Sequence, residues 1–221
     1  MILYVNGDSH STGHDAVQPG PNPEHSYGKL LADKLGHEFV CDAVAGCSND
    51  SIVARTKNYL ENNTPDFLII GWSTWEREEW QYQGKTYQVT SSGFDQLPKG
   101  LHARYKQFVI DSSIPENQWA MEDRNHDLIE EMHEYLKNKK IPHLFFNCFS
   151  YFFYRVRQNR TRKDWGNNYI DPYSQNLTYY FWLEEQGYKP SNPKYYHYGA
   201  DAHRAWADFL LPKVQDILHA K

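Results

Sequence analysis

Residues 65–72 have the sequence PDFLIIGW, an apolar run bounded by proline and by glycine–tryptophan. A run that is apolar throughout, rather than alternating, is typical of a central parallel strand that is covered on both faces. Other runs of similar character occupy residues 2–6, 38–44 and 141–148. Because segments with helical spacing separate these runs, the sequence predicts an α/β fold with a parallel, doubly wound sheet between two layers of helices.

Four helices are expected between and after these strands. Asn22 and Pro23 suit an N-cap and a first helical position, and Gly36 suits the end of that helix. Ser48 can cap a second helix, which carries an apolar face through residues 52–60. The remaining two helices are expected over residues 125–140 and 201–218, where apolar residues recur at helical spacing.

Two long segments, residues 73–122 and 149–196, interrupt this alternation and are rich in aromatic residues. Ordinary connections have about 4–6 residues, so insertions of this length are usually lids or binding loops. Each follows the carboxyl end of a predicted strand, where open α/β sheets bind ligands. We expect residues 1–221 to form one domain that carries both insertions.

The composition excludes several classes of protein. The net charge of −5 lacks the basic footprint that nucleic-acid binding requires. Aromatic residues make up 16% of the chain, which indicates either a polar, tyrosine-rich surface, the interpretation we favour, or an aromatic face that binds sugars or peptides. The odd number of cysteines, 3, argues against a disulfide framework.

The first residues, MILYVNGDSH, contain no basic region and no long apolar stretch. The sequence therefore predicts neither a signal peptide nor a transmembrane helix, and we expect a cytoplasmic protein with no membrane partner. Nothing in the sequence indicates a cofactor or an oligomeric state.

The first motif with chemical potential is NGDSHS, residues 6–11, at the end of the first predicted strand. Ser9 is expected at the carboxyl edge of the sheet, close to helix N-termini whose N–H groups favour an anionic transition state. The tripeptide Gly-Asp-Ser alone favours a plain turn after a strand, in which a side chain bonds the local backbone.

Two later motifs complete a possible site. Gly46 follows the second strand, and a glycine there lets a backbone N–H approach a reacting oxygen, although a plain strand-to-helix turn has the same pattern. His197 lies just before the last helix, where an imidazole can reach the sheet edge and act as a general base. A surface or capping histidine is the alternative, since the chain has 11 histidines.

Together, GDSH at residues 7–10 and HYGADAHRAWADFL at residues 197–210 resemble the SGNH/GDSL hydrolase superfamily. The resemblance implies a flavodoxin-like fold and activity as an esterase, lipase or carbohydrate deacetylase. It also implies that Ser9 is the nucleophile and His197 the general base. The backbone N–H groups of Ser9 and Gly46 would then bind the oxyanion, and His203 would pack within the last helix.

Two positions depart from the pattern of the superfamily. Its third block ends in an asparagine that donates to the oxyanion, whereas this chain has Ser73 followed by Thr74. Its orienting aspartate lies three residues before the histidine, at the position that Lys194 occupies here. A group elsewhere, such as Asp171, Asp201 or a backbone carbonyl, would then orient His197, unless Ser9 and His197 act as a dyad.

Further residues near these motifs are candidates for binding the substrate or a metal. The substrate-binding candidates flank the first and third strands: Asp8, His10, Trp72, Glu76 and Arg77. His10 and His14 have the spacing of two metal ligands on a helix, but they flank Gly13 in a predicted loop without an evident third ligand. We therefore expect no metal site.

The leading hypothesis is a serine hydrolase that cleaves an ester, such as an acyl or acetyl group on a carbohydrate, through Ser9 and His197. The competing hypothesis is a catalytically impaired domain of the same fold that serves as a binding or structural protein, because Ser73 and Lys194 replace functional residues. Small proteins encoded by tailed phages also resemble this chain, which makes a component of a phage particle one form of that alternative.

Overall fold

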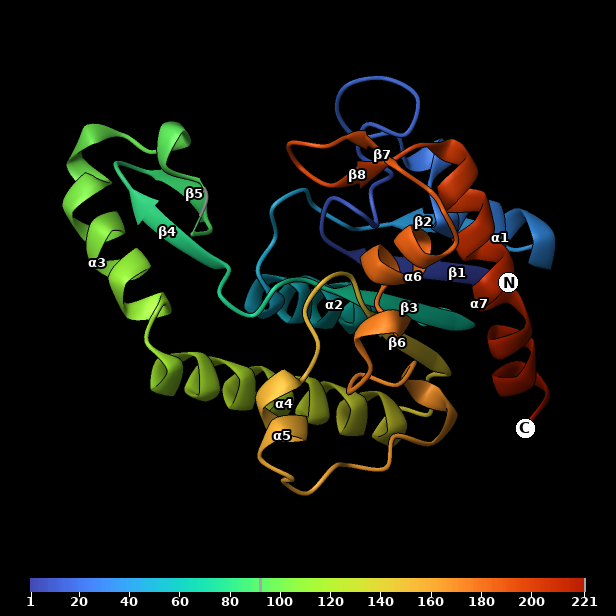
Figure 1. Ribbon diagram of the computed structural model, residues 1–221. Helices are drawn as coiled ribbons and strands as arrows, with labels where there is room; N and C mark the ends of the chain where they lie inside the picture. Colours follow the sequence, from blue (N-terminus) through green and yellow to red (C-terminus); the bar gives the residue numbers. More distant parts are fainter. Residues whose placement is uncertain (92, 221) are drawn as a thin grey trace.

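A four-stranded parallel sheet forms the centre of the computed structural model, which describes residues 1–91 and 93–220 (Figure 1). The strand order is β2-β1-β3-β6, and each neighbouring pair is parallel. The strands within the described residues are β1 (Ile2–Gly7), β2 (Glu38–Cys41), β3 (Phe67–Trp72), β4 (Glu78–Tyr82), β5 (Lys85–Val89), β6 (His143–Asn147), β7 (Pro190–Asn192) and β8 (His197–Tyr198). The parallel α/β sheet expected from the sequence is confirmed.

Helices cover both faces of this sheet. The α-helices that the structure describes are α1 (Tyr27–Leu35), α2 (Asn49–Asn62), α3 (His102–Ser112), α4 (Pro115–Asn138), α5 (Phe153–Arg157), α6 (Tyr179–Glu185) and α7 (Ala200–His219). Side chains of α1, α6 and α7 pack in one apolar core with the sheet, and those of α2 and α4 pack in a second core. In Figure 1, α1 and α7 lie side by side, away from α2 and α4. The result is the expected three-layer architecture.

The boundaries differ from the sequence prediction at two helices. Asn22 does not cap an α-helix, because its side-chain amide donates to the carbonyls of Gln18 and Gly20. A 3-10 helix (Pro23–His25) follows, and α1 begins only after Ser26, whose hydroxyl accepts from the Lys29 N–H. Helix α4 begins at Pro115 rather than near residue 125, with proline at its first position.

The insertion after β3 folds as a lobe with its own apolar cluster. The hairpin of β4 and β5 packs with α3 through Trp80, Val89 and Phe108. Figure 1 shows this lobe standing apart from the sheet, joined to it through α4 and the β3–β4 connection. The insertion after β6 contributes α5, α6 and β7. Both insertions therefore leave the carboxyl edge of the sheet, as expected.

The three cysteines, Cys41, Cys47 and Cys148, are free thiols. Among the helices of the described residues, none combines the length and apolar character that crossing a membrane requires.

Gly7, the last residue of β1, lets the chain turn sharply at the sheet edge. Its φ is +149°, and a Cβ there would lie 2.3 Å from Ser11 Oγ and 2.6 Å from the Gly71 carbonyl oxygen. Both distances are far below van der Waals contact, and the second atom belongs to the backbone of β3. No residue with a side chain fits this position without displacing the start of the following turn.

We predict that Gly7→Ala lowers the free energy of unfolding by about 3–5 kcal/mol, because backbone strain and overpacking add at this position. Urea denaturation followed by circular dichroism measures the change. Gly20→Ala is the matched control, since Gly20 also has a positive φ, +96°, but no atom within 4 Å of the added Cβ. The control is expected to lose about 1–2 kcal/mol, and equal losses in the two variants would contradict the steric argument.

Candidate active site

Ser9 lies in a tight turn at the carboxyl end of β1. The N–H groups of Ser11 and Thr12 donate to the Asp8 carbonyl at 3.0 and 3.2 Å, and the His14 N–H donates to the Ser9 carbonyl at 3.0 Å. These bonds fix the backbone on both sides of Ser9. The residue is 8% exposed, so its hydroxyl is accessible only from a cavity at the sheet edge.

That cavity has a volume of about 450 Å³ and brings together segments that are far apart in the sequence. Ser9, Gly46, Thr74 and His197 all line it. His10, the neighbour of Ser9, lies edge-on to His197, with ring centroids 5.7 Å apart. The turn after β1 and the segment before α7 therefore meet at one site.

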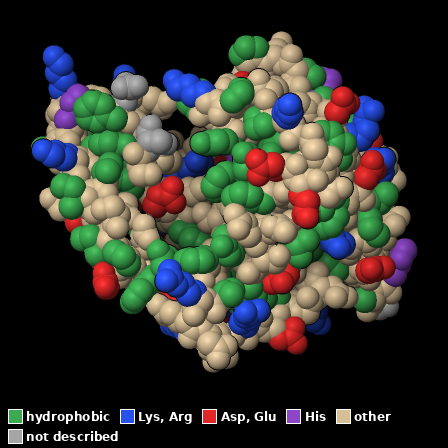
Figure 2. Space-filling model, in the orientation of Figure 1, with side chains coloured by type: hydrophobic (Ala, Val, Ile, Leu, Met, Phe, Trp, Pro, Cys, Tyr) green, Lys and Arg blue, Asp and Glu red, His purple; other side chains and the backbone are tan. Residues whose placement is uncertain are grey.

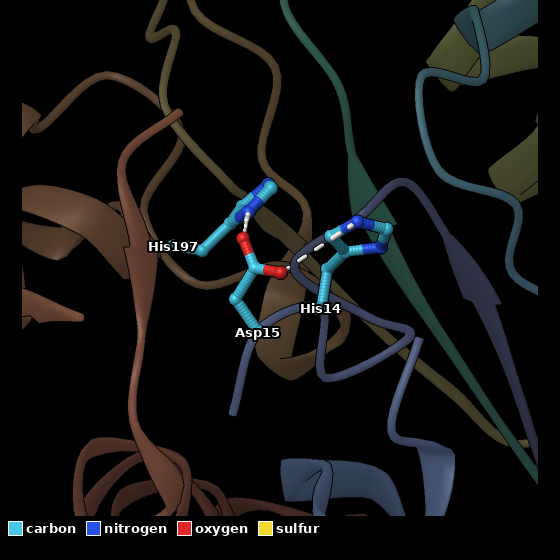
Figure 3. A group of neighbouring side chains, drawn as sticks. All are labelled: His14, Asp15 and His197. Atoms are coloured by element: carbon cyan, nitrogen blue, oxygen red, sulfur yellow. Dashed lines mark hydrogen bonds and ion pairs between the residues drawn. The ribbon is translucent and has the colours of Figure 1, made fainter. Parts of the chain in front are cut away.

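His197 is held by a carboxylate, that of Asp15 (Figure 3). His197 Nδ1 lies 2.7 Å from Asp15 Oδ2, across a separation of 182 residues. Asp15 also accepts hydrogen bonds from the Gly20 N–H at 2.9 Å and from Asn192 Nδ2 at 2.7 Å. A carboxylate can only accept, so Nδ1 carries the proton in this bond, and Nε2 of a neutral imidazole is left as the base.

Asp15 is ionised at neutral pH. Its burial raises the pKa, but the hydrogen bonds from His197, Gly20 and Asn192 outweigh burial and lower the pKa to about 2. A stable negative charge beside the imidazole favours the imidazolium form that a general base passes through.

The backbone is in the left-handed region at Asp15 and at the residue before His197. Asp15 has a φ of 59°, and Tyr196, directly before His197, has a φ of 60°. Aspartate tolerates this conformation, but a tyrosine there is an outlier that costs about 1–3 kcal/mol. Strain of this kind is typical of functional sites, where the surrounding structure imposes a geometry.

Asp15 was not predicted from the sequence, where Asp171 and Asp201 were the aspartates expected to orient His197. Neither contacts His197: Asp171 Oδ1 accepts the Tyr173 N–H at 3.0 Å, and Asp201 is an exposed residue in the first turn of α7. Those two proposals are wrong because the carboxylate comes from the loop after Ser9, not from the region around His197. Lys194, at the position usual for the aspartate, lines the cavity instead.

His203 packs within the last helix, as the resemblance implied. It is 1% exposed, and its Nδ1 accepts the Tyr27 N–H at 3.3 Å. Burial lowers the pKa of His203 to about 3, which keeps the ring neutral.

The candidate oxyanion donors fall into two groups. Within the described part of the chain, the N–H groups of Ser9 and Gly46 donate to no protein acceptor, and both residues line the cavity. Thr74 also lines the cavity, and its buried hydroxyl has no hydrogen-bond partner among the described residues. The Ser73 hydroxyl, in contrast, donates to Asp8 Oδ2 at 3.0 Å and is fully buried. Of these two hydroxyls, that of Thr74 is the one without a hydrogen-bond partner among the described residues.

Asp8 is a buried acceptor that also lines the cavity. It is 2% exposed and accepts from the His10 N–H at 3.0 Å, from Ser73 and from Arg77 Nη1 at 3.4 Å. Burial opposes ionisation of Asp8, but His10, Arg77 and these hydrogen bonds outweigh it and lower the pKa. Asp8 therefore anchors Arg77 at the cavity wall.

The other predicted substrate-binding residues divide between cavity and core. His10, Glu76 and Arg77 line the cavity, and burial lowers the pKa of His10 to about 4. Trp72 does not line it: the indole is fully buried and packs edge-on against Phe145. The expectation for Trp72 fails because its side chain points into the core between the sheet and α2 and α4.

One group of residues offers three metal-ligating atoms. Atoms of His14, Asp15 and His197 lie within 4.8 Å of one another. Asp15 and His197 are already hydrogen-bonded at 2.7 Å, so a metal ion would have to replace that bond. His10, which the sequence spacing paired with His14, does not belong to this group.

Comparisons with known proteins support the fold through structure rather than sequence. No family model matches the chain, and no curated protein matches it. The psychrotrophic esterase EstA from Pseudoalteromonas sp. superposes with a TM-score of 0.53 at 11% identity, over 99% of this chain and 98% of that one.

Two further solved structures of similar fold are carbohydrate esterases. A carbohydrate esterase family 2 enzyme with a carbohydrate-binding domain, from Corynascus thermopiles (Myceliophthora fergusii), gives a TM-score of 0.51 at 14% identity. The match covers 99% of this chain but only 66% of that longer chain. The acetyl xylan esterase AlAXEase gives 0.50 at 11% identity, over 96% of this chain and 98% of that one. The chain therefore has the SGNH/GDSL hydrolase fold.

We predict that Arg77→Met lowers the free energy of unfolding by about 3 kcal/mol at pH 7, because it leaves the Asp8 carboxylate buried without a cation. The loss is expected to shrink as the pH is lowered from 7 to 4, because without Arg77 the buried Asp8 carboxyl takes up a proton more readily. Denaturation with urea over this pH range measures both effects.

Arg124→Met is the control, because Arg124 pairs with Asp50 at an exposed site, with side chains 66% and 52% exposed. Such a pair contributes about 0–1 kcal/mol. A loss in Arg77→Met no larger than in the control would contradict the role assigned to the buried pair.

Proposed function

We propose that this chain is a serine esterase that removes a small acyl group, such as acetyl, from a carbohydrate. One observation carries the proposal: His197, which lines the same cavity as Ser9, is bonded to the Asp15 carboxylate at 2.7 Å. A histidine that a carboxylate holds in this way can act as the general base for a serine hydroxyl in the same cavity.

In the first half-reaction, Ser9 Oγ attacks the acyl carbon while its proton passes to His197 Nε2. The Asp15 carboxylate stabilises the imidazolium that forms. When the tetrahedral intermediate collapses, the bond to the sugar oxygen breaks, and His197 gives its proton to that oxygen. The products are the free sugar hydroxyl and an acyl-serine.

In the second half-reaction, water takes the place of the sugar. His197 removes a proton from the water, whose oxygen attacks the acyl carbon, and the proton then returns to Ser9 Oγ. The carboxylic acid leaves and the enzyme is restored. Each half-reaction passes through an oxyanion, which the N–H groups of Ser9 and Gly46 and the Thr74 hydroxyl would bind.

Three features support a carbohydrate ester as the substrate. Two structures of similar fold have names that mark them as carbohydrate or acetyl xylan esterases. The cavity has polar and charged residues on its wall, including Glu76, Arg77 and Gln88, which suit a hydroxylated substrate. The sheet edge also bears aromatic insertions, whose rings provide flat apolar surfaces for sugar rings.

A second candidate function is a binding or structural domain, including one in a phage particle, without catalytic activity. The observation that favours it is Ser73, since its hydroxyl is engaged with Asp8 and no asparagine amide occupies that position. Thr74 as the replacing donor and Asp15 as the orienting group favour the esterase instead.

Ser9→Ala is expected to reduce the hydrolysis of 4-nitrophenyl acetate to the uncatalysed background. Asp15→Asn is expected to lower kcat by roughly 10⁴-fold, because the amide no longer favours the required tautomer and imidazolium. Asp201→Asn is the control, since Asp201 is exposed at the start of α7 and should leave kcat unchanged. Wild-type rates in Ser9→Ala would exclude the esterase.

Thr74→Val removes one hydroxyl with little change in shape. We predict that kcat falls by roughly 10²–10³-fold, the effect of losing one oxyanion donor, while KM changes little. Steady-state kinetics on 4-nitrophenyl acetate measure both constants. The exposed Thr64→Val serves as the control, and a kcat as high in Thr74→Val as in that control would remove Thr74 from the oxyanion hole.

A further inference from the structure

A second cavity, larger than the first, adjoins the catalytic one. Its volume is about 560 Å³, and Glu76 and Phe149 line both cavities. It lies between the lobe and the body of the molecule, where α3 and the start of α4 face the segment after β6. Figure 2 shows the molecule hollowed in this region, with hydrophobic side chains on the walls. We call this cavity the aromatic groove.

Aromatic rings and neutral polar groups together line the groove. The aromatic residues are Trp75, Phe149, Tyr151, Phe153, Tyr154 and Phe181. Between them lie serines and glutamines, among which Ser150 and Gln175 have side chains without a hydrogen bond within the described residues. Flat apolar faces alternating with hydroxyl and amide groups match the apolar faces and hydroxyl rims of sugar rings.

The charge of the groove excludes an anionic ligand. No lysine, arginine or histidine is among its lining residues in the described part of the chain. Of its two carboxylates, Glu122 is 2% exposed and accepts the N–H groups of Tyr154 and Arg155 at 2.9 and 2.7 Å. Its charge is therefore neutralised by N–H groups at the start of α5, and no cationic side chain among the described lining residues would pair with an anion in the groove.

The aromatic walls are held in place before any ligand binds. The Trp75 indole is stacked on Phe152 with centroids 4.9 Å apart and an interplanar angle of 7°, and its Nε1 donates to the Tyr151 carbonyl at 3.3 Å. The Tyr154 hydroxyl donates to Gln118 of α4. Rigid rings lose little conformational entropy when a ligand stacks on them.

We propose that the aromatic groove binds a neutral oligosaccharide chain, the alcohol side of the ester whose acyl group is at Ser9. This proposal rests on the proposed esterase function, because that function places the acyl group in the catalytic cavity. The junction at Glu76 and Phe149 would then hold the acylated sugar unit, and further units of the chain would extend over Trp75, Tyr151 and Phe153.

Binding is tested separately from catalysis with the Ser9→Ala protein and xylotetraose, by isothermal titration calorimetry. We expect binding that Phe153→Ala and, on the opposite element α6, Phe181→Ala each weaken by at least about fivefold. Phe94→Ala is the matched control, because Phe94 is 46% exposed, against 38% for Phe153, but lines neither cavity. Thermal denaturation of each variant checks that the fold is retained.

Three outcomes would overturn the proposal. One is no binding of xylotetraose, cellotetraose or chitotetraose. Another is equal binding in Phe153→Ala, Phe181→Ala and Phe94→Ala. The third is that Phe153→Ala slows the hydrolysis of 4-nitrophenyl octanoate but leaves glycan binding intact, which would assign the groove to an acyl chain.

Charge gives a further arm of the same experiment. Tetragalacturonate has the same length as the neutral tetrasaccharides, and we expect it to bind at least about fivefold more weakly than xylotetraose; binding as tight would contradict a neutral ligand. If the wild type has no esterase activity but xylotetraose binding depends on Phe153, the proposed catalytic function fails and the aromatic groove is supported as a glycan site.

Discussion

The hydrogen bond between Asp15 and His197 joins an N-terminal loop to a C-terminal strand at the carboxyl edge of the sheet. Asp15 belongs to the loop after β1 and His197 to the short strand before α7, and their contact spans 182 residues. The Gly20 N–H from the same loop and the Asn192 amide from β7, the hairpin partner of β8, bind the same carboxylate, so two segments converge on one charge. Left-handed backbone at Asp15 and Tyr196 shows what this convergence costs the chain locally.

The close packing of β1 against β3 at Gly7 is a second constraint on the site. Gly7 allows the chain to pass within contact distance of Gly71, and the turn that follows presents Ser9 to the cavity while it buries Asp8. The Asn6 amide ties the end of β1 to α2 through Ile52 and Thr56. Because apolar cores lie on both faces of the sheet, this edge is a rigid platform, and the insertions form the walls above it.

Much of this arrangement was predictable from the sequence. Apolar runs identified the parallel strands, and the Gly-Asp-Ser turn placed Ser9 at the carboxyl edge of the sheet. Asp15 was not predictable, because its contact with His197 depends on the path of an irregular loop that has no periodicity. The sequence also gave no sign that Ser73 faces Asp8 while Thr74 faces the cavity. Successive side chains point to opposite faces only within a strand, so the sequence does not predict which way a side chain points after the strand has ended. Trp72 stands at the carboxyl end of a strand, where ligand-binding residues are expected, but its side chain packs into the apolar core.

The central claim is that Ser9 is a nucleophile activated by the His197–Asp15 pair. Its most direct test is reaction of the folded protein with a fluorophosphonate, followed by mass spectrometry of the intact protein and of its peptides. The account predicts one adduct per chain, on Ser9, formed rapidly in the wild type and much more slowly in His197→Ala. Absence of an adduct, an adduct on another residue, or equal rates with and without His197 would contradict it.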